Sequence, residues 1–136
     1  MPYLVDTNVL SELRKSKRAD PNVLRWRDRQ PLEDLYISVM TIGEIRQGIV
    51  RLEARDPVQA AALEVWRLET LEIFGRRILP VSLEIAERWA GICPKQPLPP
   101  IDGILAATAL EDDLTMVTRN IGDFLRAGVA ILNPFE

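Results

Sequence analysis

Histidine is absent from the 136-residue sequence, and cysteine occurs once, at Cys93. Without histidine, the chain lacks the commonest general acid or base near neutral pH and the commonest side-chain ligand of transition metals. Nucleases that use a histidine pair and hydrolases with a Ser-His-Asp triad are therefore excluded. A single cysteine forms no internal disulfide and has no cysteine partner for a zinc site, so we expect Cys93 to be a buried or unreactive thiol.

Long apolar runs are also absent from the sequence. No stretch approaches the roughly 18 to 20 apolar residues that span a bilayer, and the first ten residues lack a basic segment followed by an apolar one. We therefore expect a cytoplasmic protein with no membrane partner. Apolar residues make up 47% of the 136 residues and charged residues 27%. This composition predicts one compact domain that spans residues 1–136.

The net charge of −3 leaves little excess of lysine and arginine for a nucleic-acid interface. Contacts to phosphate groups usually need a cluster of cationic side chains. The objection weakens if acidic side chains gather around a divalent cation, because the cation then supplies positive charge where a phosphate would lie. The positions of the acidic residues therefore decide between these interpretations.

Short apolar runs alternate with stretches of helical periodicity along the chain. The runs predict strands at 3–5, 35–39, 78–81, 116–118 and 130–132. Apolar spacing predicts helices at 9–13, 20–30, 41–55, 57–74, 83–92 and 101–112. This alternation predicts an α/β fold, in which helices cover both faces of a parallel sheet. Ligand sites in such sheets lie beyond the carboxyl ends of the strands.

Four carboxylates follow predicted strands or begin predicted helices, and each has an ordinary structural explanation. Asp6 directly follows the first strand, expected at the centre of the sheet, and could cap the next helix. Glu44 ends a Thr-x-x-Glu sequence, which is the pattern of a capping box. Asp102 falls in the first turn of a helix, where the helix dipole favours negative charge. Asp123, in the sequence TRNIGDF, could cap a short helix.

All four carboxylates fall at the same edge of the predicted sheet, which independent capping does not require. Carboxylates brought together repel one another unless a cation neutralises them. Oxygen ligands without histidine or cysteine suit Mg²⁺ or Mn²⁺. The four positions therefore predict a metal site at this edge of the sheet.

The segments VDTNVLSEL, TIGEI, PPIDGILAATAL and TMVTRNIGDF, followed by ILNPF, resemble PIN-domain ribonucleases of the VapC toxin type over nearly the whole chain. The resemblance implies a three-layer α/β/α sandwich with a mostly parallel five-stranded sheet. It also implies RNA cleavage that depends on Mg²⁺ or Mn²⁺, a homodimer, and a cognate antitoxin that blocks the acidic pocket. The family's catalytic and metal-binding positions match Asp6, Glu44, Asp102 and Asp123, with Asp6 and Asp102 as direct metal ligands.

Polar and cationic residues complete the predicted site. By resemblance, Thr118 and Asn120 support the carboxylates, and Asn8 orients the first of them. Arg46 and Arg119 are the predicted RNA-binding residues, because Arg119 follows the fourth strand and Arg46 lies two residues from the second carboxylate. The basic stretch 14–18 is a further candidate. The tryptophans could stack on bases, but their helical apolar positions favour core or interface roles for Trp26, Trp66 and Trp89.

The predicted reaction is hydrolysis of an RNA phosphodiester by a metal-activated water, which leaves 5′-phosphate and 3′-hydroxyl ends. Two other functions compete with it. A receiver-like signalling domain needs a phosphoacceptor aspartate after the third strand, where ILPVSLE offers only Ser82 and Glu84. A PIN-fold module that binds RNA or proteins without catalysis would keep the same fold, and the intact acidic set argues against it.

Overall fold

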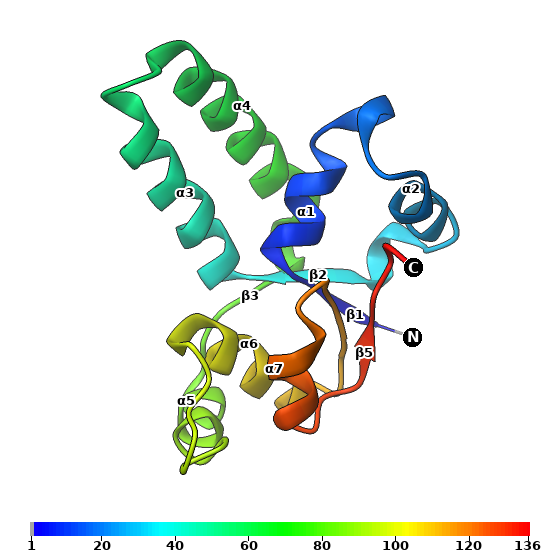
Figure 1. Ribbon diagram of the computed structural model, residues 1–136, viewed down its shortest axis with the longest axis vertical. Helices are drawn as coiled ribbons and strands as arrows, with labels where there is room; N and C mark the ends of the chain where they lie inside the picture. Colours follow the sequence, from blue (N-terminus) through cyan, green and yellow to red (C-terminus); the bar gives the residue numbers. More distant parts are fainter. Residues whose placement is uncertain (1) are drawn as a thin grey trace.

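The computed structural model describes residues 2–136 (Figure 1). Within that range, the strands form one five-stranded sheet in the order β3-β2-β1-β4-β5. Their bounds are β1 Tyr3–Val5, β2 Leu35–Ser38, β3 Ile78–Leu79, β4 Thr115–Val117 and β5 Ile131–Leu132. Every pairing between these neighbours is parallel, which confirms the predicted parallel sheet and places β1 at its centre.

Helices cover both faces of this sheet. They are α1 Thr7–Leu13, α2 Pro21–Asp28, α3 Val39–Glu53, α4 Pro57–Phe74, α5 Leu83–Ala90, α6 Pro100–Glu111 and α7 Ile121–Arg126. In Figure 1, α1, α3 and α4 lie on one side of the strands, and α5, α6 and α7 lie on the other. The predicted three-layer α/β/α sandwich is therefore confirmed.

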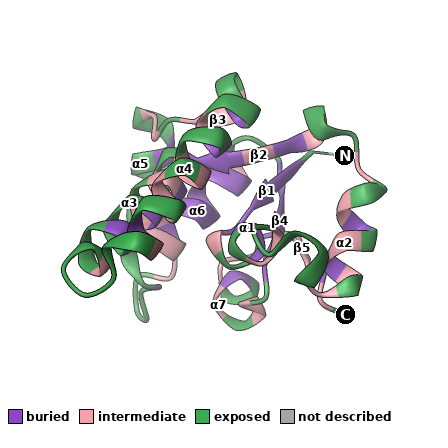
Figure 2. Cartoon of the chain, turned by 90° about the horizontal axis from the view of Figure 1, so that it is seen from above, coloured by how far each residue is buried: buried purple, intermediate pink, exposed green. Residues whose placement is uncertain are grey.

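The central strand contributes to two cores. Tyr3 and Val5 pack with residues of the first four helices, whereas Leu4 packs with residues of α6 and α7. Successive side chains of a strand point to opposite faces, so a strand buried on both sides is apolar throughout. Figure 2 shows β1 and β2 buried, while the outer surfaces of the helices are exposed.

Local signals fix several helix ends where the sequence predicts them. The Asp20 side chain accepts a hydrogen bond from the Asn22 backbone N–H at 2.8 Å, and Pro21 begins α2. Proline suits this first position because its missing N–H would have no partner inside the helix. Gly75 ends α4 with a φ of 50°, a backbone conformation that side-chain-bearing residues rarely adopt.

The start of α3 differs from the prediction. The helix begins at Val39, and its cap is Ser38, whose hydroxyl accepts a hydrogen bond from the Met40 N–H at 3.0 Å. The Thr-x-x-Glu sequence therefore lies inside the helix and is no capping box. Glu44 therefore does not cap α3, and its side chain can contact residues at the edge of the sheet.

Two expectations from composition concern the membrane and the cysteine. Among residues 2–136, no helix combines the length and the apolar composition that a membrane crossing requires. Cys93 is partly exposed rather than buried, and its Sγ lies 3.4 Å from the backbone carbonyl oxygen of Arg126. It lies in the proline-rich loop before α6 and belongs to neither of the two core clusters.

Candidate active site

Asp6 leaves the end of the central strand and is held from several directions. Its backbone N–H donates to the Val117 carbonyl at 2.9 Å, which continues the β1–β4 pairing for one more residue. Its Oδ1 accepts from the Thr7 N–H at 2.7 Å, and its Oδ2 accepts from the Thr118 hydroxyl at 2.8 Å. The residue is only 6% exposed. These contacts fix its orientation at the edge of the sheet.

Asn8 and Thr118 tie the segments after β1 and β4 together. The Asn8 Nδ2 lies 3.3 Å from both the Asp6 Oδ2 and the Thr118 Oγ1, and its Oδ1 accepts from the Arg119 N–H at 3.3 Å. The Thr118 Oγ1 also accepts from the Asn120 N–H at 2.9 Å. The three predicted support residues therefore join one network with Asp6.

Asn120 joins the carboxylates of α6 and α7. Its Nδ2 lies 3.2 Å from the Asp102 Oδ2 and 3.2 Å from the Asp123 Oδ2. Both aspartates are in the first turn of their helices. Asp123 also forms an ion pair with Arg126 at 3.3 Å. One amide thus bridges two of the predicted catalytic positions.

Glu44 reaches the same site from α3. Its Oε1 accepts a hydrogen bond from the Thr7 hydroxyl at 2.7 Å, and Thr7 is also bonded to Asp6. A continuous set of hydrogen bonds therefore links all four predicted carboxylates. Thr7 is the residue of this network that the sequence did not single out as functional. Its only sequence signal is its position directly after Asp6.

Burial raises the pKa values of Asp6, Glu44 and Asp102, and neighbouring carboxylates add to the rise at the last two. Burial raises the pKa of Asp6, although the hydrogen bonds that it accepts partly offset the rise. Burial also raises the pKa of Glu44, and the charge of Asp6 adds to it. The pKa of Asp102 rises to about 6, first through burial and then through the charges of the other three carboxylates. The other three carboxylates therefore all act on Asp102, and a bound cation would offset this repulsion.

Comparison with known proteins assigns the chain to a family. A model of the PIN domain matches residues 3–129. The chain belongs to the PIN domain family. Toxin FitB of Neisseria gonorrhoeae is 36% identical over 140 residues, covering 98% of each chain. VapC ribonuclease Y4jK of Sinorhizobium fredii is 34% identical over 140 residues, covering 98% of this chain and 97% of its own.

Solved structures agree with this assignment of the PIN domain. The crystal structure of FitAcB from Neisseria gonorrhoeae superposes with a TM-score of 0.84 at 35% identity and covers 98% of this chain and 99% of its own. A toxin-antitoxin complex from Klebsiella pneumoniae superposes with a TM-score of 0.72 at 28% identity and covers 98% of both chains. The family resemblance that the sequence motifs indicated is therefore confirmed.

The donor atoms of this PIN domain fit a hard divalent cation. They are carboxylate, hydroxyl and amide oxygens, which Mg²⁺ and Mn²⁺ prefer. Within residues 2–136, no three His, Cys, Asp or Glu side chains are arranged closely enough to hold a metal ion as they stand. Mg²⁺ is usually held by only one or two carboxylates and keeps several waters. The raised pKa of Asp102 is the observation that matches such a site.

The two predicted RNA-binding arginines have different surroundings in the PIN domain. The Arg46 Nη1 lies 3.4 Å from a Glu64 carboxylate oxygen and 3.7 Å from one of Glu53. The pair with Glu64 connects α3 with α4, the pair with Glu53 lies within α3, and both neutralise part of the Arg46 charge. The Arg119 guanidinium stacks over the Phe135 ring at 3.6 Å from its centroid. Arg119 is thus fixed beside the carboxylate network, and the RNA contact of both arginines stays a prediction.

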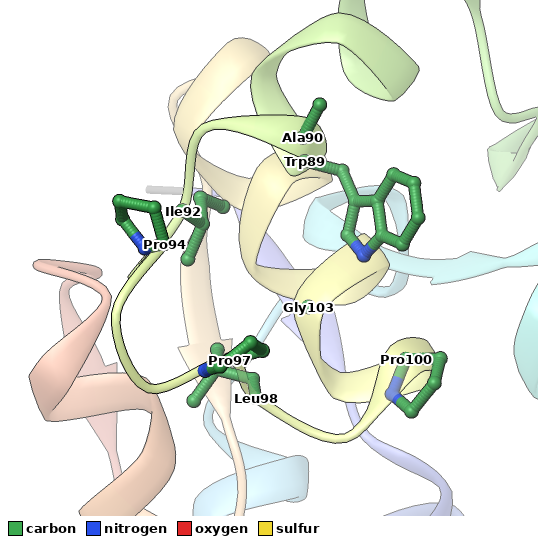
Figure 3. Close-up of a pocket in the computed structure, with 8 residues that line it drawn as sticks. All are labelled: Trp89, Ala90, Ile92, Pro94, Pro97, Leu98, Pro100 and Gly103. Carbon is green, nitrogen blue, oxygen red and sulfur yellow. The ribbon is translucent and has the colours of Figure 1, made fainter.

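A separate apolar cavity lies where α5 and the proline-rich loop meet α6, next to Gly103. Its volume is about 320 Å³. Figure 3 shows the Trp89 ring beside Gly103, with Pro97 and Leu98 on the loop nearby. Its lining offers no titratable side chain. This cavity therefore belongs to the packing that positions α6.

Proposed function

We propose that this PIN-domain protein is a metal-dependent endoribonuclease, and that residues 1–136 act as one nuclease domain. The observation that carries the proposal is the hydrogen-bond network that brings four carboxylates to the edge of the sheet. The name of the relative Y4jK, a VapC ribonuclease, supports RNA as the substrate. RNA in the cytoplasm would be the target.

We propose Asp6 and Asp102 as the residues that hold Mg²⁺ or Mn²⁺. The ion, when bound, supplies Lewis-acid activation of water and positive charge for a phosphate. Thr118 and Asn8 keep the Asp6 carboxylate oriented through hydrogen bonds. Asn120 holds Asp102 in the same way.

Glu44 and Asp123 complete the proposed catalytic set. Glu44 is fixed by the Thr7 hydroxyl, which lets it accept a proton from an attacking water on the α3 side of the site. Asp123 is held by Asn120 on the opposite side. Attack of water on phosphorus would leave a 5′-phosphate and a 3′-hydroxyl. A 2′,3′-cyclic phosphate among the products would contradict this reaction, since a chain without histidine has no histidine pair to form it.

We propose that the protein is the toxin of a toxin–antitoxin pair and forms a homodimer. The antitoxin partner is supported by the name of the relative Toxin FitB and by the toxin-antitoxin complex from Klebsiella pneumoniae. The homodimer rests on the family resemblance. Co-purification with a small partner encoded nearby would support the pair, and light scattering of the purified toxin would measure its mass.

The first test is cleavage of a mixed RNA substrate with Mg²⁺ or Mn²⁺. We expect the wild-type protein to cleave, and we expect Asp6→Asn and Asp102→Asn to lose on the order of 100-fold or more in rate, because each removes a charge from the site. Asp28→Asn is the matched control, since the Asp28 side chain is 66% exposed and, among residues 2–136, forms an ion pair only with Arg27. RNA binding without cleavage under all conditions would instead favour a catalytically silent PIN-fold module.

A further inference from the structure

A groove opens from the carboxylate network between α1, α3 and α4. Its volume is about 270 Å³. Thr7 and Glu44, which share a hydrogen bond of 2.7 Å, form one end of it. Arg14 and Trp66 line it as well, and Ile49 contributes to its apolar surface. Figure 1 shows α1 beside the pair of long helices α3 and α4. The groove is therefore an extension of the candidate active site.

One face of α1 supplies a row of polar groups to this groove. Thr7, Ser11 and Arg14 follow one another at intervals of four and three residues, so they share a face of the helix, and all three line the groove. The row begins at the carboxylate network and ends about 10 Å further along the helix, at roughly 1.5 Å per residue. The first two groups are hydroxyls and the last is a guanidinium.

Arg14 is the one cation among the described residues that line this groove. None of the ion pairs formed among residues 2–136 includes it. Its guanidinium carbon lies over the Trp66 ring at 5.9 Å from the centroid. By contrast, Arg46 and Arg67 on the neighbouring helices both pair with Glu64. The positive charge of Arg14 is thus the one that this groove leaves for a ligand.

Trp66 offers an aromatic ring beside that charge. The residue is partly buried against the first core, and so its ring is held in place from behind. An aromatic ring next to a guanidinium is the combination that binds single-stranded nucleic acid, because bases stack on the ring and phosphates pair with the cation. This groove begins at the cluster of carboxylates proposed to hold a metal ion. It could therefore bind an RNA strand whose cleaved bond lies at that ion.

We propose that this groove binds the RNA nucleotide next to the cleaved bond, with its base stacked on Trp66 and its phosphate paired with Arg14. The inference rests on the proposed ribonuclease function. It assigns a binding role to a tryptophan that the sequence pattern placed in a core or interface. It also shifts the main phosphate contact from Arg46, which pairs with Glu64 and Glu53, to the cation at the end of α1.

The test is the kinetics of cleavage of a single-stranded RNA oligonucleotide by variants of the complete chain. We expect Trp66→Leu to raise KM about 10-fold, with a smaller change in kcat, because stacking is lost while the carboxylates stay. Trp66→Phe keeps an aromatic ring and should restore most of the affinity. Arg14→Gln should raise KM and make the salt dependence of binding less steep by about one phosphate contact, whereas Arg14→Lys should keep that slope.

Two control variants separate stacking and charge from general effects. Leu68→Ala removes an apolar side chain that is 51% exposed on α4 and does not line the groove. Arg25→Gln removes a cation of α2 that is bonded to Asn22. Both should leave KM for the oligonucleotide unchanged. Thermal melting of each variant identifies any that fails to fold, and the Arg14 variants alter only an exposed side chain.

The outcomes distinguish the groove from the activity. If the wild-type chain cleaves RNA and the KM values of Trp66→Leu and Arg14→Gln equal that of the controls, the groove proposal is wrong and the ribonuclease stands. If the same variants lose affinity for a purified antitoxin but not for RNA, the groove belongs to the antitoxin and the proposal is also wrong. If the wild-type chain cleaves nothing, the activity fails, and fluorescence anisotropy of the bound oligonucleotide still compares the variants. Equal affinities there would overturn the groove.

Discussion

Single residues of this site have structural and chemical roles at the same time. Asp6 caps α1 through its Oδ1 and accepts a hydrogen bond from the Thr118 hydroxyl through its Oδ2. Asp102 stands in the favourable first turn of α6 and yet carries a pKa of about 6. The ordinary and the functional interpretations of these carboxylates are therefore compatible. The sequence could identify the residues, but it could not predict the Thr7–Glu44 contact, which joins positions 37 residues apart.

The raised pKa of Asp102 predicts how the stability of the metal-free protein depends on pH. The folded chain holds the Asp102 proton up to a pKa of about 6, above the ordinary value of 3.8. Between these values the folded state binds more protons than the unfolded state, so the free energy of unfolding falls as pH rises through about 6. Asp6 and Glu44 shift in the same direction. We expect melting temperatures measured with a chelator to fall between about pH 4 and pH 6 and to level off above that range.

Asp102→Asn should remove part of this pH dependence. At neutral pH we expect the variant to be more stable than the wild type by on the order of 1 kcal/mol, a figure reduced because Asp102 is partly exposed to solvent. The Asn120 amide can still donate to the carbonyl oxygen of the new side chain. Asp28→Asn serves again as the control. The same slope of melting temperature against pH in the wild type and in Asp102→Asn would contradict the repulsion within the site.

At the scale of elements, local signals predicted some helix ends closely and missed others by two residues. Asp20 caps α2 at the predicted helix start of residue 20, and Gly75 ends α4 directly after the predicted end at residue 74. The predicted third strand was too long, because β3 pairs only with β2 and that partner ends at Ser38. The start of α3 was placed late, since Ser38 is both the last residue of a strand and the helix cap, and the apolar residues after it continue the strand pattern.

Packing of α5 against α6 predicts an effect of Gly103→Ala. A Cβ atom at Gly103 would lie 2.9 Å from the Cδ1 and Nε1 atoms of Trp89 (Figure 3), so the indole ring would have to move. Alanine also favours a helix by about 1 kcal/mol over glycine. In the wild-type background we expect the clash to cancel this gain or exceed it. In a Trp89→Ala background we expect Gly103→Ala to stabilise the protein by about 1 kcal/mol.

The coupling between these two substitutions is measured by urea unfolding of the two single variants and the double variant. A coupling energy of about 1 kcal/mol or more would place the contact between α5 and α6 at Gly103. Additive effects would show that the indole turns away at no cost. Because Gly103 directly follows Asp102, a shift of α6 should also weaken metal binding by the Gly103→Ala variant.

For the whole molecule, a parallel sheet gathers charge at one end. The carboxyl ends of β1, β2 and β4 and the N-termini of α6 and α7 bring together residues from position 6 to position 123. Alternation of strands and helices predicted this convergence, because a helical crossover lets neighbouring strands run in the same direction. The exact bonds within the site depend on side-chain packing that no local pattern specifies.

This concentration of negative charge predicts that divalent metal stabilises the whole fold. An ion that binds only the folded state raises the free energy of unfolding by about 2.7 kcal/mol at 100 times its dissociation constant, or several degrees in melting temperature. We expect Mg²⁺ and Mn²⁺ to raise the melting temperature of the wild type at pH 7.5, and to do so less at pH 5, where a proton on Asp102 competes with the ion. Asp6→Asn should lose most of the effect at equal ionic strength, and Asp28→Asn should keep it. An equal rise in Asp6→Asn would mean that the stabilising ions bind elsewhere on the surface.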